Sequence, residues 1–405
     1  MSIKQPSLPS SRSHGRELPE PSEEAISHSQ QILDVIKTSI QQADGRISFQ
    51  QFMQTALFEP VLGYYRCGTE KFGAMGDFMT APESSLLFGQ CLVRFIQSTN
   101  TANNILEVGA GSGRLAVSIL KALAAQSALP ESYYILELSA ELRERQRQNI
   151  QVELPEYIDQ LVWLDALPDA FNGVVIANEL LDAMPVTRFK LDNSQVFEEY
   201  VVCNEDELSF SYKPTSDQRL LARIEVLKQK TSIAETEPYH SEVNFIAQDW
   251  IRSLADGIES AVVLIIDYGY PRNAYYHLQR HMGTLMCHYQ HRAHPDPLIL
   301  TGIQDITAHI DFTAMADAAL ESGMEVVGFT TQAHFLLNLD LLGLLDARQQ
   351  ETGQAGLRNY FQASGEVKRL TLPGEMGESF KVMAFSKNYQ DDVAGFEQHD
   401  IRHLL

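Results

Sequence analysis

The chain of 405 residues lacks any apolar run of the length, roughly 18–20 residues, that a membrane-spanning helix needs. Its amino-terminal residues also lack the apolar stretch of a secretory signal. Residues 1–23 are instead rich in Ser, Pro and charge, and we expect a disordered arm there. Arg12 and Arg16 hint at a mitochondrial transit peptide, but Glu17 and Glu20 weaken that hint. We therefore expect a bacterial cytoplasmic protein without membrane insertion.

Cysteines and basic residues are also scarce. The four cysteines form no C-x-x-C pair, so we expect buried thiols in a reducing compartment. They are Cys67, Cys91, Cys203 and Cys287. Lys and Arg number 31 against 53 Asp and Glu, which gives a formal net charge of −22. This balance argues against a protein that grips nucleic-acid phosphates, and it suits a substrate bearing arginine or lysine.

A glycine-rich turn follows one of the apolar segments. Residues 105–114 read ILEVGAGSGR, which predicts a buried strand, a turn and the start of a helix. Glycines let a backbone take positive φ and approach a ligand closely, and a helix N-terminus offers free N–H groups. Gly109, Gly111 and Gly113 alternate behind Glu107, whose carboxylate suits the cationic end of a sulfonium amino acid. The pattern is similar to the S-adenosylmethionine loop of class I methyltransferases.

Two more acids follow predicted strands. Glu137 stands at the end of the strand predicted at 133–136, where a carboxylate can accept hydrogen bonds from the ribose hydroxyls of a nucleoside cofactor. Asp165 follows the strand predicted at 161–164 and is placed for the adenine amino group. The sequence is equally consistent with Asp165 being an ordinary surface carboxylate that does not contact a ligand.

The chain alternates predicted strands and helices from residue 104 to 190, which is typical of a doubly wound parallel sheet. Strands predicted at 187–191, 195–203 and 208–212 then indicate an antiparallel meander, and the core resumes at 260–266. We expect an α/β fold: a Rossmann-like sheet with helices on both faces, an N-terminal helical unit and an inserted β meander. The expected parts are an N-terminal unit at 24–98, the first half of the core at 99–190, a β-rich insertion at 191–258, and at 259–405 the second half with acceptor-pocket insertions.

Five separated blocks carry a family resemblance. They are GYY at 63–65 with GDFMTAPE at 76–83, the glycine loop, ANELLDAMPV at 177–186, DYG at 267–269 and QDITAHIDF at 304–312. In these blocks the chain resembles the MidA family of class I S-adenosylmethionine-dependent methyltransferases, which includes mitochondrial assembly factors of respiratory complex I.

This resemblance implies a methyltransferase fold and S-adenosylmethionine as cofactor, with no metal. It carries over Glu107, Gly109, Gly111 and Gly113 as cofactor contacts, and it places the segments 178–179 and 305–311 in the pocket. For mitochondrial members it implies symmetric dimethylation of an arginine on a core complex I subunit, in the matrix. The oligomeric state stays open, with a homodimer as one alternative.

Methyl transfer needs a nucleophile placed opposite the sulfur and charges arranged around it. Glu179 follows a strand predicted at 173–177, and Asp182 lies three residues on, on one face of a predicted short helix. With Asn178, we expect these carboxylates to bind an acceptor guanidinium between them. The alternative is that Glu179 only caps the first turn of a helix or places a negative charge there. His309 could accept the released proton or only bond a carboxylate. We expect the loop of Asp77 and the ring of Tyr268 to cover the cofactor.

Three other functions compete with this hypothesis. Cys287, His288, His291 and His294 resemble zinc ligands in spacing, but no second ligand pair accompanies them. An NAD-dependent oxidoreductase is disfavoured, because Arg114 stands where a dinucleotide turn has its third glycine. An assembly chaperone with a structural or vestigial cofactor site is the remaining alternative.

Overall fold

The strand predicted before the glycine turn and those predicted at 133–136, 161–164, 173–177 and 260–266 assemble into one central sheet. The structure is a computed structural model that describes residues 18–67, 81–100, 103–236, 238–349 and 353–405. Within these residues the strand order is β15-β16-β10-β5-β2-β3-β4, with β14 beside β10. Neighbouring strands run parallel, except that β16 is antiparallel to both of its neighbours. The bounds are β2 Asn104–Val108, β3 Ser132–Leu136, β4 Leu161–Leu164, β5 Phe171–Asn178, β10 Ile258–Tyr270, β14 Ile310–Asp311, β15 Glu325–Thr331 and β16 Phe380–Lys387.

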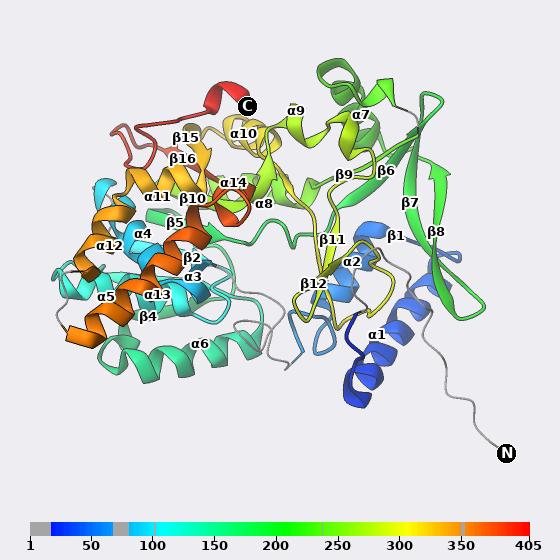
Figure 1. The fold of residues 1–405 in the computed structure, drawn as a ribbon. Helices are drawn as coiled ribbons and strands as arrows, with labels where there is room; N and C mark the ends of the chain where they lie inside the picture. The colour runs from blue at the N-terminus through cyan, green and yellow to red at the C-terminus, as the bar shows by residue number, and fades with distance from the viewer. Residues whose placement is uncertain (1–17, 68–80, 101–102, 237, 350–352) are drawn as a thin grey trace.

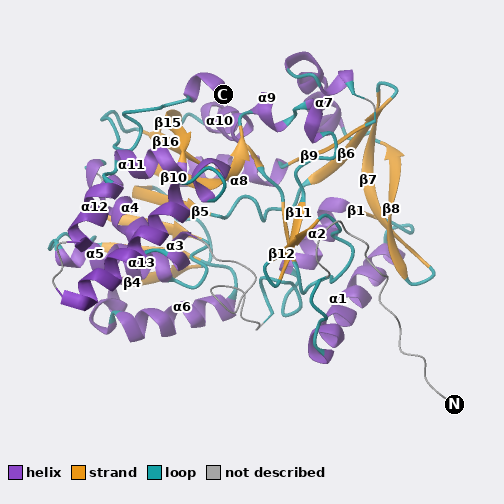
Figure 2. Ribbon diagram, in the orientation of Figure 1, coloured by secondary structure: helices purple, strands orange, loops and turns teal. Residues whose placement is uncertain are grey.

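Helices cover both faces of this sheet (Figure 2). One face packs against α4, α5, α11 and α13, and the other against α8 and α10. Because both faces are covered, β10 reads as a continuous apolar run and is buried from Ala261 to Asp267. The bounds are α4 Leu86–Ser98, α5 Arg114–Ala125, α8 Phe245–Gly257, α10 Phe312–Glu321, α11 Gln332–Asn338 and α13 Gly353–Thr371. The predicted Rossmann-like fold is confirmed.

A second lobe lies beside this core (Figure 1). It contains the predicted meander, in which β6, β7 and β8 are joined by turns at Asn193–Ser194 and Glu205–Asp206, all with positive φ. Strands β1 and β9 complete a five-stranded sheet, and α7 packs on it. The bounds are β1 Ile47–Ser48, β6 Thr187–Asp192, β7 Gln195–Asn204, β8 Glu207–Pro214, β9 Tyr239–Val243 and α7 Gln218–Lys230.

A small three-stranded sheet joins the same lobe and was not predicted. It consists of β11 Met286–Tyr289, β12 Arg292–His294 and β13 Asp305–Thr307. Its Cys287 and Ile306 share one apolar cluster with the N-terminal helices α1 Glu23–Gln42 and α2 Phe49–Phe58. Segments from the start, the middle and the later part of the chain therefore build this lobe together.

Two predicted helices differ from the structure. The leucine-rich run at 335–345 predicts one helix, but the structure has two, α11 and α12, because Asp340 between them takes φ +57°. Residues 179–184 form turns rather than a helix, and Glu179 itself has φ +50°. The remaining bounds are α3 Ala81–Ser84, α6 Ala140–Glu153, α9 Arg272–Tyr275, α12 Leu341–Gln349, α14 Met376–Ser379, and the 3-10 turns η1 Pro155–Gln160, η2 Ile233–Glu235, η3 Leu278–Arg280 and η4 Arg402–Leu404.

The cysteines are free thiols. Cys67, Cys91 and Cys287 are buried as predicted, whereas Cys203 is half-buried. Among the helices of the described ranges, none combines the length and apolarity needed to cross a membrane.

Candidate active site

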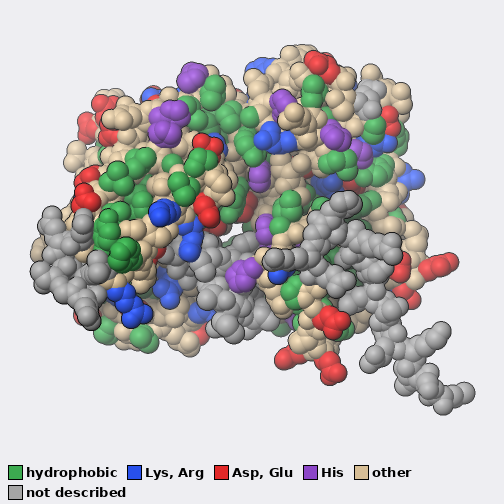
Figure 3. Space-filling view, viewed as in Figure 1, with side chains coloured by type: hydrophobic (Ala, Val, Ile, Leu, Met, Phe, Trp, Pro, Cys, Tyr) green, Lys and Arg blue, Asp and Glu red, His purple; other side chains and the backbone are tan. Residues whose placement is uncertain are grey.

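A cavity of about 650 Å³ lies where the two lobes meet, at the carboxyl ends of β2, β3 and β5. In the space-filling view the molecule is hollowed between the lobes (Figure 3). Open α/β sheets bind their ligands at this edge, and the volume suits a ligand of nucleoside size. One side of the cavity belongs to the core, and α2, β11, β12 and β13 contribute the other.

The glycine loop forms one end of the cavity. Gly109, Gly111 and Gly113 have φ of +70°, +53° and +84°, a region that side chains rarely adopt. Gly109 and Gly111 line the cavity, whereas Gly113 lies behind it as the N-cap of α5. Gly113 has no side chain with which to cap α5, and backbone N–H groups at a helix N-terminus can donate to a ligand.

Glu107 lines the cavity directly below this loop and is 3 % exposed. Its Oε2 accepts a hydrogen bond of 2.6 Å from the Tyr133 hydroxyl. Burial raises the pKa of Glu107 to about 7, although this hydrogen bond opposes the rise. A cationic group in the cavity would favour the ionised form, as expected for the amino group of an amino-acid cofactor.

Glu137 also lines the cavity, and Gln146 ties it to the glycine loop. The Glu137 carboxylate accepts hydrogen bonds from the backbone N–H of Ser139 at 2.9 Å and from Gln146 Nε2 at 3.2 Å. The same Gln146 Nε2 donates to the Gly111 carbonyl at 3.0 Å, and its Oε1 accepts from Trp163 Nε1 at 2.9 Å. This fully buried amide fixes the loop and the acid relative to each other.

Two sequence-predicted cofactor residues lie apart from this group. Asp165 is exposed, forms a 2.8 Å ion pair with Arg143 and does not line the cavity. Its contact with adenine stays a prediction. Asp77 lies outside the described residues.

Asn178, Glu179 and Asp182 lie together at the end of β5, and all three line the cavity. Asn178 Nδ2 donates to Glu179 Oε1 at 3.2 Å. Burial, followed by the nearby Asp182, raises the pKa of Glu179 to about 8, and burial raises that of Asp182 to about 7. Within the described ranges neither carboxylate forms an ion pair. The left-handed φ of Glu179 is a local strain of the kind that clusters at functional sites.

Asp267 holds the turn that carries these acids. Its Oδ2 accepts from the backbone N–H of Leu181 at 2.9 Å and of Asp182 at 3.2 Å, and its Oδ1 accepts from the N–H of Tyr268 at 2.8 Å. Asp267 is fully buried, and burial raises its pKa well above the usual range. In the sequence Asp267 belongs to the DYG block at 267–269 and has no predicted role of its own, although an acid that follows an apolar strand is a usable signal.

His309 does not line the cavity. Its ring stacks against Tyr268 with centroids 6.0 Å apart, and Tyr268 is the residue that reaches the cavity. Burial lowers the pKa of His309 to about 4, so it is neutral at physiological pH.

The second lobe contributes Phe58, Tyr65, His288, His291 and Asp305 to the opposite wall. The family resemblance predicts Asp305 in the pocket, whereas no sequence pattern predicts a role for Tyr65. In the described part of the chain, no group of three His, Cys, Asp or Glu side chains is arranged to hold a metal ion.

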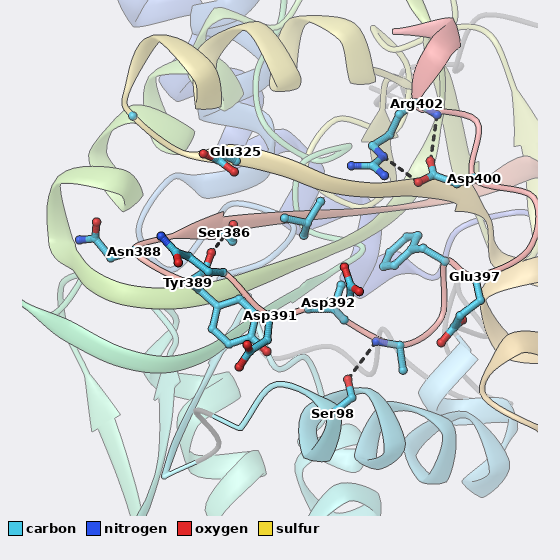
Figure 4. A pocket seen from close by; sticks show the side chains of 16 residues that line it. Ser98, Glu325, Ser386, Asn388, Tyr389, Asp391, Asp392, Glu397, Asp400 and Arg402 are labelled. Carbon is cyan, nitrogen blue, oxygen red and sulfur yellow. Dashed lines mark hydrogen bonds and ion pairs between the residues drawn. The ribbon is translucent and has the colours of Figure 1, made fainter.

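A different hollow, of about 920 Å³, lies at the other edge of the sheet (Figure 4). Its walls include Glu325 at the start of β15 and Asn388, Asp391 and Asp392 after β16. Since β10 and β15 are both antiparallel to β16, this is the edge at which the parallel strands begin. Ligands of open α/β sheets bind at the opposite edge. The cavity between the lobes is therefore the candidate active site.

The residues of this cavity fit S-adenosyl-L-methionine. The open glycine backbone allows close approach, Glu107 suits an amino group, and Glu137 suits a pair of ribose hydroxyls. The same cavity is lined by Glu179 and Asp182 from the turn at residues 179–184, called the β5 turn below. The methyl donor and the methyl acceptor would therefore share one cavity.

Comparisons with known proteins agree with this fit. The family model described as "Putative S-adenosyl-L-methionine-dependent methyltransferase" matches residues 87–330. A Drosophila melanogaster relative named protein arginine methyltransferase NDUFAF7 homolog, mitochondrial, is 27 % identical over 402 residues, covering 91 % of this chain and 88 % of its own. A Danio rerio protein arginine methyltransferase NDUFAF7, mitochondrial, is 26 % identical over 380 residues, covering 84 % and 83 %.

A crystal structure from Burkholderia thailandensis with bound S-adenosyl-homocysteine is 36 % identical, with a TM-score of 0.90 over 96 % of this chain and 100 % of that one. The resemblance to the MidA family is confirmed. Because the family model matches more than half of the chain and the likeness to a solved structure extends over nearly all of it, the chain belongs to the family of S-adenosyl-L-methionine-dependent methyltransferases.

Proposed function

We propose that the protein methylates an arginine guanidinium of a protein acceptor. The observation that carries this proposal is a pair of carboxylates, the half-buried Glu179 and the buried Asp182, which line the cavity with no ion-pair partner among the residues described. Buried acids without a cation favour a cationic ligand. The names of the Drosophila and Danio relatives support the same class of acceptor.

A guanidinium presents its N–H groups in one plane, so adjacent carboxylates can orient it and leave one nitrogen directed at the donor. S-adenosyl-L-methionine, when bound, supplies the activated methyl group. The methylated guanidinium is still a cation, so each transfer releases one proton. Glu179 and Asp182, whose pKa values lie near neutrality, suit this proton better than His309 does.

The finer parts of the proposal rest on resemblance. We propose that the acceptor is a subunit of respiratory complex I or a similar protein and that the product is symmetric dimethylarginine. The Drosophila and Danio relatives are named as mitochondrial, and for this chain we propose the bacterial cytoplasm. A homodimer stays a prediction.

The test is transfer of an isotope-labelled methyl group into an extract of cells that lack the protein. We expect mass spectrometry to find the label on arginine side chains after the purified protein and labelled donor are added. Label on lysine or on small molecules would contradict the arginine proposal. Tight cofactor binding without any transfer would favour the assembly chaperone instead.

The raised pKa values predict a pH dependence. A guanidinium stays charged throughout, whereas Glu179 and Asp182 ionise with pKa near 8 and 7 in the free protein. Acceptor binding should therefore strengthen as pH rises from 6 to 8.5 and should release protons. Ethylguanidinium, a mimic of the arginine side chain, can be titrated by NMR into the protein saturated with S-adenosyl-homocysteine. Affinity that is flat or falls over this range would contradict the carboxylate clamp.

A further inference from the structure

Tyr65 and Asp305 form a hydrogen-bonded pair on the part of the cavity wall that the second lobe contributes. The Tyr65 hydroxyl donates to Asp305 Oδ2 at 2.9 Å, across a sequence separation of 240 residues. Both residues line the cavity, and Asp305 is only 2 % exposed. The pair therefore joins the N-terminal unit to β13 at the cavity surface.

This pair lies close to the core carboxylates. The backbone N–H of Ala308, just after β13, donates to the Asp182 carbonyl at 2.9 Å, which ties the small sheet to the β5 turn. Burial, followed by the negative charges of Asp305 and Asp182, raises the pKa of the Tyr65 hydroxyl well above its usual range. Tyr65 therefore stays neutral and lies within electrostatic reach of acids from both lobes.

Neighbouring aromatic rings fix the position of Tyr65. Its ring stacks on Phe58, also a cavity residue, with centroids 5.5 Å apart and an interplanar angle of 19°. Tyr64 packs edge-on against it at 5.0 Å. Because stacked rings hold the hydroxyl in one place, the second lobe presents a preorganised carboxylate and flat apolar surfaces to the cavity.

We propose that Tyr65 and Asp305 form a second wall of the acceptor site, which selects a guanidinium over an ammonium ion. This inference rests on the proposed function. A guanidinium carries five N–H donors in a rigid plane and stacks on aromatic rings, whereas an ammonium is a compact ion with three donors. Acids from both lobes, beside the aromatic rings of Phe58 and Tyr65 that also line the cavity, can satisfy the extended plane. The β5 turn alone would bind either cation.

The probes are ethylguanidinium and propylammonium, titrated separately by ligand-observed NMR into the full-length protein saturated with S-adenosyl-homocysteine. We expect the wild type to prefer ethylguanidinium. Asp305→Asn should weaken ethylguanidinium binding about fivefold and Tyr65→Phe about threefold, with propylammonium little changed in either. Affinity for S-adenosyl-homocysteine should stay within twofold and serves as the check on folding.

Tyr212→Phe is the matched control. Tyr212 donates to Glu199 Oε2 at 2.6 Å in the same lobe but away from the cavity, so its loss should leave both probes unaffected. Equal weakening of both cations in Asp305→Asn, or an unaltered preference in both variants, would overturn the second wall while the arginine proposal stands. A wild type that does not bind ethylguanidinium would overturn the proposed function, and the second wall with it.

Discussion

Glu179→Gln should slow methyl transfer at least thirtyfold while leaving cofactor affinity within about twofold of wild type. The substitution keeps the size of the side chain and removes the charge that would pair with the bound guanidinium. Losing one member of such a hydrogen-bonded charge pair costs roughly 2 kcal/mol or more. Asp182→Asn should act in the same direction but more weakly. For each variant, turnover is measured on the acceptor that receives the labelled methyl group, and cofactor affinity is measured by calorimetry with S-adenosyl-homocysteine.

The same substitution should stabilise the fold. The pKa of Glu179 is raised by folding to about 8, so the wild-type protein loses stability as pH rises from the ordinary glutamate value towards 8. One pKa unit corresponds to about 1.4 kcal/mol, and we expect the free energy of unfolding of Glu179→Gln to exceed that of wild type by at least this amount at pH 9. The gain should be smaller at pH 5. Slower transfer together with lower stability at pH 9 would mean that Glu179 is structural.

Gly111→Val should abolish binding of S-adenosyl-L-methionine, with a loss of at least about a hundredfold, or ~2.7 kcal/mol. Gly111 lines the cavity with φ +53°, a conformation in which a β-branched residue is strained, and the added side chain would enter the space of the ligand. Calorimetry should also show that the wild type binds S-adenosyl-L-methionine and S-adenosyl-homocysteine but not NAD.

Gly111→Asn separates the two causes of this loss. Asparagine tolerates the left-handed region, so the loop backbone is kept while a side chain is added. If close approach of the ligand is what matters, both variants lose binding and the asparagine variant stays nearly as stable as wild type. Normal binding by Gly111→Asn would show instead that only the backbone conformation is needed.

The cofactor half of the site was accessible from sequence because local patterns determine it. A strand, a glycine turn and a helix lie within residues 104–125, and Glu137 directly follows the next strand. Each signal depends on neighbours in the chain. Gln146 was missed because nothing local distinguishes it from the other polar residues of α6; only tertiary packing brings its amide between Gly111 and Glu137.

The acceptor half was only partly predictable. The position of Glu179 and Asp182 after a strand predicts them as site residues. The segment that carries them is a turn and not the predicted helix, because its shape depends on Asp267, which lies 85 residues beyond Asp182. The pair of Tyr65 and Asp305 depends on contacts between distant segments, which periodicity does not encode. Short strands such as β12, three residues long, leave too little pattern to detect.

The antiparallel strand β16 limits how this chain can be divided. It pairs with β10 along eight residues and with β15 on its other side, yet it begins at Phe380, fifty residues beyond the region 87–330 that defines the family. A fragment cut at those limits would separate β15 from β10 and leave the apolar strand β10 as an unpaired edge, an arrangement prone to aggregation. Removing the first 86 residues would also remove Tyr65 from the cavity. This enzyme should therefore not be separable into a minimal catalytic domain.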